Sequence, residues 1–263
     1  MDLQLKDKVA LITGSSRGLG YATARLLAQE GTRVALNSRS EKPLVEAAQK
    51  IAAETGSPTA ALPGDVTQPA MPNQLIEQVI AQFGRLDILI ANAGGPSSGA
   101  FESFSDDDWQ HAIDLSFMSQ VRLIRAALPY LKQSPAASVL TVTSSSVKQP
   151  IPNLVLSNSI RAATVGLTKT LALELGGSGI RFNSILPSWT KTDRVQDLMQ
   201  ARAKINGTTP EEEMLKQAKD SPFGRMAEPE EFAAAAVFLV SPVASYITGV
   251  MFSVDGGMYK GTL

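Results

Sequence analysis

The first pattern that could do chemistry is a run of spaced glycines, Thr13-Gly14-Ser15-Ser16-Arg17-Gly18-Leu19-Gly20. It directly follows an apolar segment and opens an amphipathic one, Tyr21 to Glu30. Glycines let the backbone turn tightly and approach phosphate groups, while a helix N-terminus offers free N–H groups and the positive end of its dipole. The spacing therefore predicts a site for the pyrophosphate of a nicotinamide dinucleotide. Its expected contacts are Gly14, Ser16, Arg17, Gly18, Leu19 and Gly20.

The residues after the second apolar strand pattern indicate which dinucleotide fits. Sites that prefer NAD carry Asp or Glu about 20 residues beyond the glycine turn, to bind a ribose 2′-hydroxyl. Here that stretch is Asn37-Ser38-Arg39-Ser40, which has no carboxylate. Arg17 and Arg39 could pair with a 2′-phosphate, so we expect NADP(H), with Ser38 and Arg39 among its contacts. The alternative interpretation is that both arginines are solvated surface residues.

Composition and charge narrow the class of partner. With 263 residues and a net charge of −1, the chain has no strong basic field for nucleic acid or an anionic membrane. It has no cysteine, which excludes disulfides and thiolate catalysis and is compatible with a reducing compartment. The first residues lack the apolar core of a signal peptide, no segment is long enough to span a bilayer, and no cluster has metal-ligand spacing. We expect a cytoplasmic protein without a metal.

Short apolar runs alternate with amphipathic segments along the whole chain. The expected strands are 9–12, 33–36, 86–90, 138–142, 180–185 and 250–254, and the expected helices are 18–30, 41–54, 70–83, 105–132, 157–176 and 228–240. This alternation predicts βαβ units, in a Rossmann-type, doubly wound parallel sheet with helices on both faces. We expect residues 1–263 to form a single dinucleotide-binding and catalytic domain whose ligands lie beyond the carboxyl ends of the strands.

Residues 193–222 break the alternation. They predict two charged helical pieces on either side of Asn206-Gly207, inserted on the ligand face. An insertion of this size beside a ligand site is typical of a lid. The alternative is a solvated surface excursion.

These motifs together resemble those of the short-chain dehydrogenase/reductase family over nearly the whole chain. The matches are the glycine run, Asp65-Val66 after the third strand, Asn92-Ala93-Gly94 after the fourth, and 181–192, which resembles the segment beside the nicotinamide. The resemblance implies cofactor contacts from Asp65, Val66, Asn92, Gly94, Pro187 and Thr192. Residues 247–257 resemble a strand and turn that lie near a neighbouring subunit in tetrameric members, so we expect a homo-oligomer, either a tetramer or a dimer.

The same resemblance identifies four catalytic positions, three of which depart from the family's pattern. Ser144 matches the catalytic serine. The tyrosine and lysine positions of the family's Tyr-x-x-x-Lys pair fall on Ser157 and Arg161, and the asparagine position falls on Ser116. In the family, the lysine lowers the pKa of the tyrosine so that the phenol exchanges a proton with the substrate oxygen. That proton step has no evident counterpart here.

The replacements keep part of this chemistry. Arg161 lies one helical turn after Ser157 and could bind the nicotinamide ribose hydroxyls, but a guanidinium stays charged and cannot shuttle protons. Ser144 and Ser157 could polarise a carbonyl, although the alternative is that both hydroxyls bond only nearby backbone. Lys148, close to Ser144 in sequence, is a candidate substitute acid. His111 is expected to point elsewhere as a surface or interface residue.

Three functional hypotheses follow. The first is an NADP(H)-dependent oxidoreductase that moves a hydride between the nicotinamide and a small-molecule carbonyl or alcohol, similar to a 3-oxoacyl reductase. The second is a non-catalytic NADP(H)-binding sensor or interaction protein that has lost reductase chemistry. The third is a different reaction in the same cleft, such as elimination or isomerisation.

Overall fold

The computed structural model describes residues 1–262 and contains one seven-stranded sheet in the order β3-β2-β1-β4-β5-β6-β7. Every strand pairing in it is parallel. The strands are β1 (Val9–Thr13), β2 (Arg33–Ser38), β3 (Thr59–Pro63), β4 (Ile88–Ala91), β5 (Ser138–Val142), β6 (Arg181–Pro187) and β7 (Met251–Val254). The predicted doubly wound α/β fold is confirmed.

The residues of the central strand β1 form one continuous apolar run because both faces of the strand are covered. All of its residues are buried, and successive side chains point to opposite faces of the sheet. Ala10 and Ile12 belong to one apolar cluster, whereas Val9 and Leu11 belong to the other. A strand covered on both faces needs apolar residues at every position rather than at alternate ones.

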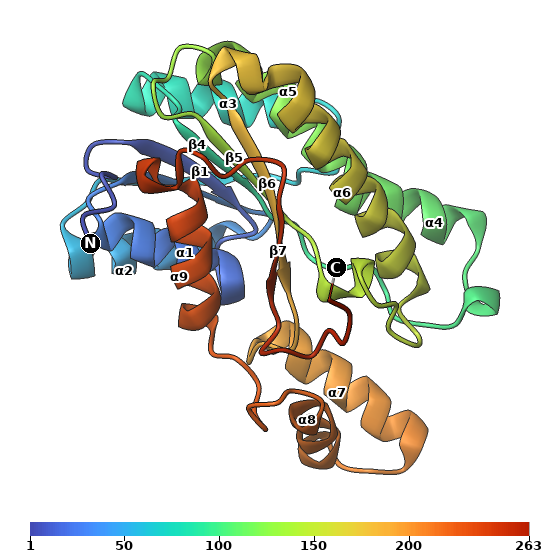
Figure 1. Cartoon of the computed structure of the whole chain (residues 1–263). Coiled ribbons are helices and arrows are strands. Elements are labelled where there is room, and N and C mark those ends of the chain that lie inside the picture. Colours follow the sequence, from blue (N-terminus) through green and yellow to red (C-terminus); the bar gives the residue numbers. More distant parts are fainter. Residues whose placement is uncertain (263) are drawn as a thin grey trace.

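Helices cover the two faces in two groups (Figure 1). The first cluster is covered by α1 (Gly18–Gln29), α2 (Glu41–Thr55) and α9 (Pro229–Val240). The second is covered by α3 (Met71–Phe83), α5 (Ser119–Leu131) and α6 (Val155–Leu175). The outer elements are α4 (Asp106–Ile113), α7 (Asp193–Asn206) and α8 (Pro210–Lys219).

The continuous helix expected over 105–132 is divided into two. A capping box between Ser105 and Asp108 starts α4, and a π-helical turn over Asp114–Met118 separates α4 from α5. The carbonyl of Ser116 in this turn accepts hydrogen bonds from Thr164 Oγ1 on α6 and Gln120 Nε2, both at 3.1 Å. Amphipathic periodicity does not reveal such a turn, because the polar partner on α6 is distant in sequence.

The insertion forms the two helices that the sequence predicted. Thr192 begins α7 by accepting a hydrogen bond from the backbone N–H of Val195. Gly207, at φ +65°, ends it, and a Thr209–Glu212 capping box begins α8. Both helices lie together beyond the end of β6 (Figure 1). This position puts the start of α7 at the carboxyl edge of the sheet.

Candidate active site

A cleft of about 420 Å³ lies at the carboxyl edge of the sheet, between the loops after β1, β4 and β5 and the start of α7. The neighbouring strands β1 and β4 mark the point where the strand order reverses, and parallel sheets bind ligands at such points. Many of the residues selected from the sequence line this cleft: Gly14, Arg17, Gly18, Leu19, Gly20, Arg39, Asn92, Gly94, Ser144, Ser157, Arg161, Pro187 and Thr192.

The glycine turn forms one end of the cleft, and its geometry requires glycine at two positions. Gly14 has φ +59°, and a Cβ there would lie 2.9 Å from Asn92 Nδ2. A Cβ on Gly20 would lie 2.3 Å from the carbonyl oxygen of Gly14. No side chain caps the N-terminus of α1, so its first N–H groups are available to an anion. The turn fits the pyrophosphate of a dinucleotide.

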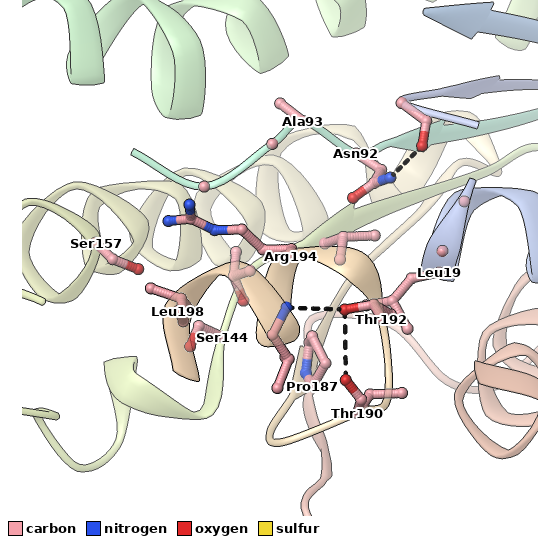
Figure 2. Close-up of a pocket in the computed structure, with 18 of the residues that line it drawn as sticks. Leu19, Asn92, Ala93, Ser144, Ser157, Pro187, Thr190, Thr192, Arg194 and Leu198 are labelled. Carbon is pink, nitrogen blue, oxygen red and sulfur yellow. Dashed lines mark hydrogen bonds between the residues drawn. The ribbon is translucent and has the colours of Figure 1, made fainter. Parts of the chain in front are cut away.

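Asn92 connects the loop after β4 to this turn. Its Nδ2 donates to the carbonyl oxygen of Gly14 at 3.1 Å (Figure 2). Its backbone N–H donates to Thr13 Oγ1 at 3.0 Å, and that hydroxyl donates to the Asn92 carbonyl oxygen at 2.6 Å. These three bonds fix the two loops against each other, so Asn92 positions the cleft wall that carries Gly94.

The end of β2 and the neighbouring glycine turn offer two cations, and the end of β2 carries no carboxylate. Arg39 lines the cleft and forms no ion pair among residues 1–262. Arg17 Nη1 lies 3.0 Å from Asp193 Oδ2, and both side chains are mainly exposed. Asn37 is buried and donates from Nδ2 to the carbonyl oxygens of Leu62 and Gly64, so it supports the strand ends. This surface is suited to a phosphate group.

Four predicted contacts lie outside the lining of the cleft: Ser16, Ser38, Asp65 and Val66. Asp65 Oδ1 accepts hydrogen bonds from the backbone N–H and the hydroxyl of Thr67. Ser38 Oγ donates to the Ser40 carbonyl oxygen at 3.3 Å. The contacts expected of these four residues with the cofactor stay predictions.

Ser144 and Ser157 both line the end of the cleft away from the glycine turn (Figure 2). Ser144 follows β5, and its Oγ accepts a hydrogen bond from the backbone N–H of Ser146 at 3.1 Å, which leaves the hydroxyl proton free to be donated. Ser157 lies in the first turn of α6, and only 9% of it is exposed. Its hydroxyl makes no hydrogen bond within residues 1–262. Two hydroxyl donors are therefore available to one ligand.

Arg161 lies one turn further along α6 and is 7% exposed. Its Nη1 donates to the carbonyl oxygens of Val142 and Thr143, both at 2.9 Å. These bonds hold the guanidinium at the end of β5. Burial, together with the positive charge of Arg194, lowers the pKa of Arg161 to about 10, so the group is charged at neutral pH.

Ser116, the fourth predicted catalytic residue, does not line the cleft. Only 1% of it is exposed, and its buried Oγ has no hydrogen-bond partner among residues 1–262. The π-helical turn directs the backbone carbonyl of Ser116 to Thr164 on α6. In this structure Ser116 therefore contributes its carbonyl to the packing behind the cleft, rather than a side chain within it.

Arg194 is a cleft residue that the sequence interpretation missed. It extends from α7 toward the loop after β4 (Figure 2), where its Nη2 donates to the Pro96 carbonyl oxygen at 2.7 Å. Burial lowers the pKa of Arg194, and Asp197 acts against that effect. The available signal was its place two residues after Thr192, at the start of a helix expected on the ligand face.

The remaining candidates lie away from the cleft lining. Lys148 is exposed, with Nζ 5.2 Å from the centre of the Tyr259 ring, and does not line the cleft. This position argues against Lys148 as a substitute acid. His111 is exposed on α4. Within residues 1–262, no helix has the length and apolar character needed to cross a bilayer, and no cluster of acidic or histidine side chains could hold a metal ion.

Comparisons with known proteins agree with this geometry. A family model described as enoyl-(acyl carrier protein) reductase matches residues 14–259. A 3-oxoacyl-[acyl-carrier-protein] reductase of Chlamydia muridarum is 31% identical over 98% of this chain and 100% of its own. A short chain dehydrogenase/reductase of Aspergillus oryzae is 32% identical over 97% of this chain and 95% of its own.

Among solved structures, L-sorbose reductase from Gluconobacter frateurii, complexed with NADPH and L-sorbose, superposes with a TM-score of 0.95. It shares 34% identity, over 99% of this chain and 100% of its own. These relatives span the whole sheet, the glycine turn and the cleft. The chain belongs to the short-chain dehydrogenase/reductase family of NAD(P)-dependent oxidoreductases.

Proposed function

We propose that this protein is an NADPH-dependent reductase of small-molecule carbonyl compounds, acting through Ser144, Ser157 and Arg161. The observation that carries the proposal is that one cleft joins the glycine turn to two hydroxyl donors and a buried guanidinium. A carbonyl substrate needs such donors where negative charge develops on its oxygen.

Support for NADPH over NADH comes from the end of β2. Arg17 and Arg39 lie at the cleft and no carboxylate stands at the end of this strand to repel a 2′-phosphate. The Gluconobacter frateurii relative was solved with NADPH. We also propose that the cofactor contacts include Gly14, Ser16, Arg17, Gly18, Leu19, Gly20, Ser38, Arg39, Asp65, Val66, Asn92, Gly94, Arg161, Pro187 and Thr192.

When bound, NADPH would supply the hydride. Ser157 then donates its unpartnered hydroxyl to the carbonyl oxygen, and Ser144, oriented by the N–H of Ser146, donates a second hydrogen bond. Arg161 provides positive charge next to the developing negative charge. Because a guanidinium does not release its proton at neutral pH, the final proton comes from water in the open cleft. This route differs from the family's use of tyrosine and lysine.

The proposal extends to the insertion and the assembly. We propose that residues 1–263 form one domain in which α7 and α8 act as a lid, because the start of α7 lines the cleft.

We also propose a cytoplasmic homo-oligomer, either a tetramer or a dimer. Its support is the sheet edge at β7, where Phe252 is 40% exposed and Tyr246 nearby in sequence is fully exposed. Light scattering with size-exclusion chromatography tests the assembly, and a monomer at micromolar concentration would contradict it.

The test of the activity is NADPH oxidation by purified protein with ketones, aldehydes, ketoses, 2-oxo and 3-oxo acids, and 3-oxoacyl thioesters. We expect turnover with at least one class, and tighter fluorescence titration with NADPH than with NADH. No turnover across the panel would overturn the reductase proposal. Tighter binding of NADH would overturn the cofactor assignment alone.

A second candidate is a non-catalytic NADP(H)-binding sensor or interaction protein. The observation that favours it is the presence of Ser157 and Arg161 where the family has its tyrosine and lysine. Turnover that is lost in Ser144→Ala while NADPH binding is kept would exclude this candidate. The double replacement Ser157→Tyr, Arg161→Lys adds a further test, because a gain of activity would mean that the cleft is otherwise competent.

A further inference from the structure

Two arginine side chains from different elements converge on the loop after β4. A Cβ built on Gly95 would lie 3.4 Å from Arg194 Nη2 and 3.8 Å from Arg161 Nη2. Arg161 comes from α6 and Arg194 from α7, and both line the cleft. Glycine at position 95 gives both guanidinium groups room beside this backbone.

Neither guanidinium has a counter-ion among residues 1–262. No carboxylate forms an ion pair with Arg161 or Arg194. Asp193 is paired with Arg17, and Asp197 affects Arg194 only at longer range. Two like charges together, one of them 7% exposed, are unfavourable without an anion.

The arginines also keep hydrogen-bond donors free. Arg161 uses only Nη1, so Nε and Nη2 make no hydrogen bond within residues 1–262. Arg194 uses only Nη2, on Pro96. A guanidinium presents its N–H groups as a planar fork that matches the two oxygens of a carboxylate. The pair therefore has free donors for an anionic group such as a carboxylate.

Figure 2 places Arg194 at the same end of the cleft as Ser144, Ser157 and Leu198. We propose that Arg161 and Arg194 bind a carboxylate of the substrate, so that the substrates are oxo acids with a free carboxylate beside the carbonyl to be reduced. This inference rests on the proposed reductase function and names its substrate class. Neither a ketose nor an acyl thioester carries a carboxylate at this place, so both should be poorer substrates.

The turnover experiment compares three oxo acids with their uncharged methyl esters: 2-oxobutanoate, acetoacetate and levulinate. Wild type should prefer at least one acid to its ester. Arg194→Gln should raise the KM of that acid about tenfold or more, and should change the KM of the ester and the Kd of NADPH little. Arg125→Gln is the matched control, because Arg125 is exposed on α5 and away from the cleft lining.

A binding experiment separates this inference from the proposed function. NADPH with 3-hydroxybutyrate cannot react, since both are reduced, so the Tm of that mixture reports binding alone. We expect 3-hydroxybutyrate to raise the Tm of the NADPH complex and its methyl ester to leave the Tm unchanged. In Arg194→Gln, 3-hydroxybutyrate should no longer raise the Tm. This result without turnover of any compound would keep the carboxylate site and reject the reductase.

Two outcomes would overturn the carboxylate site. In the first, esters, ketoses or thioesters turn over as well as the acids, and Arg194→Gln changes none of them. In the second, Arg194→Gln weakens NADPH binding and affects acids and esters equally, which would make Arg194 a contact for the cofactor's phosphates. Arg194→Lys provides a second variant that keeps the charge and loses the fork, and the proposal expects it to weaken acid binding selectively.

Discussion

The two serine hydroxyls in the cleft form few hydrogen bonds within the protein, so both can bond to a ligand. Ser157 is the clearest case, since its side chain is buried and its hydroxyl makes no hydrogen bond within residues 1–262. Ser144 differs, because the N–H of Ser146 already fixes its hydroxyl. The two serines therefore have unequal roles, with one oriented before binding and the other oriented by the ligand.

We expect Ser157→Ala to lower kcat by about a hundredfold to a thousandfold, because removal of one donor to a developing oxyanion has an effect of that order. The Kd of NADPH should not change, since the hydroxyl faces the substrate end of the cleft. Steady-state kinetics and fluorescence titration measure the two effects. Ser145→Ala is a suitable control on the same cleft. An unchanged kcat in Ser157→Ala would mean that this hydroxyl does not contact the reacting carbonyl.

Arg39→Ala should weaken NADPH binding about tenfold and leave NADH binding nearly unchanged, because only NADPH carries the 2′-phosphate that this residue would pair with. Titrations of both cofactors, with Arg125→Ala as the control, measure the ratio. An equal loss for the two cofactors would contradict the assignment of Arg39 to the 2′-phosphate. Increasing salt should also weaken the wild-type preference, because both partners are accessible to solvent.

At the scale of the element, local sequence patterns were sufficient to predict a helix or strand wherever its structure depends on its own residues. The run 138–142 predicts β5 with its observed ends, and Asn206-Gly207 marks the break between α7 and α8. The π-helical turn at Asp114–Met118 was not predictable in this way, because its partner is Thr164 on another helix. The resemblance put Ser116 at the asparagine position of the catalytic set, whereas the structure buries its side chain outside the cleft lining.

The strand–turn–helix unit from β1 to α1 gives the sharpest prediction for an element. Gly20→Ala would put a Cβ 2.3 Å from the Gly14 carbonyl oxygen, so the turn and the start of α1 must move apart. We expect NADPH binding to weaken by at least about tenfold, because the phosphate site depends on that geometry. Gly166→Ala is the matched control, since its Cβ would meet nothing within 4 Å on α6. Equal NADPH affinities for the two variants would exclude the turn as the phosphate site.

At the scale of the whole molecule, the cleft exists because the sheet topology joins segments that are far apart in the sequence. Arg17 and Asp193 meet across 176 positions, and Arg194 and Pro96 across 98. Family resemblance identified Ser144, Ser157 and Arg161, because each occupies a motif position. Arg194 has no such position, so its role emerges only when α7 is placed beside the loop after β4.

Asp87 also joins segments that are distant in the sequence. It lies away from the cleft lining, so we expect it to affect the stability of the fold and not the activity. It is fully buried at the start of β4. Its Oδ2 accepts from the Val9 N–H and Arg85 Nε, and its Oδ1 accepts from Arg85 Nη2 and Ser134 Oγ. Burial alone would raise the pKa of Asp87, but the bonds from Arg85, Ser134 and Val9 outweigh it and lower the pKa.

A carboxyl group whose pKa is lower in the folded state stabilises the protein above its unfolded pKa of about 3.9, and this stabilisation is lost as the pH falls through the folded pKa. We expect Asp87→Asn to lower the free energy of unfolding by about 1–3 kcal/mol at pH 7, because an amide cannot accept all four bonds. This difference from wild type should be constant above pH 5 and should shrink below about pH 4, where the unfolded chain takes up a proton at Asp87 while the folded protein still holds it ionised. Urea denaturation at several pH values measures it, with Glu77→Gln, an exposed substitution on α3, as the control. A difference that persisted unchanged into acid would mean that the shape of the side chain, and not its charge, holds β1, β4 and the loop after α5 together.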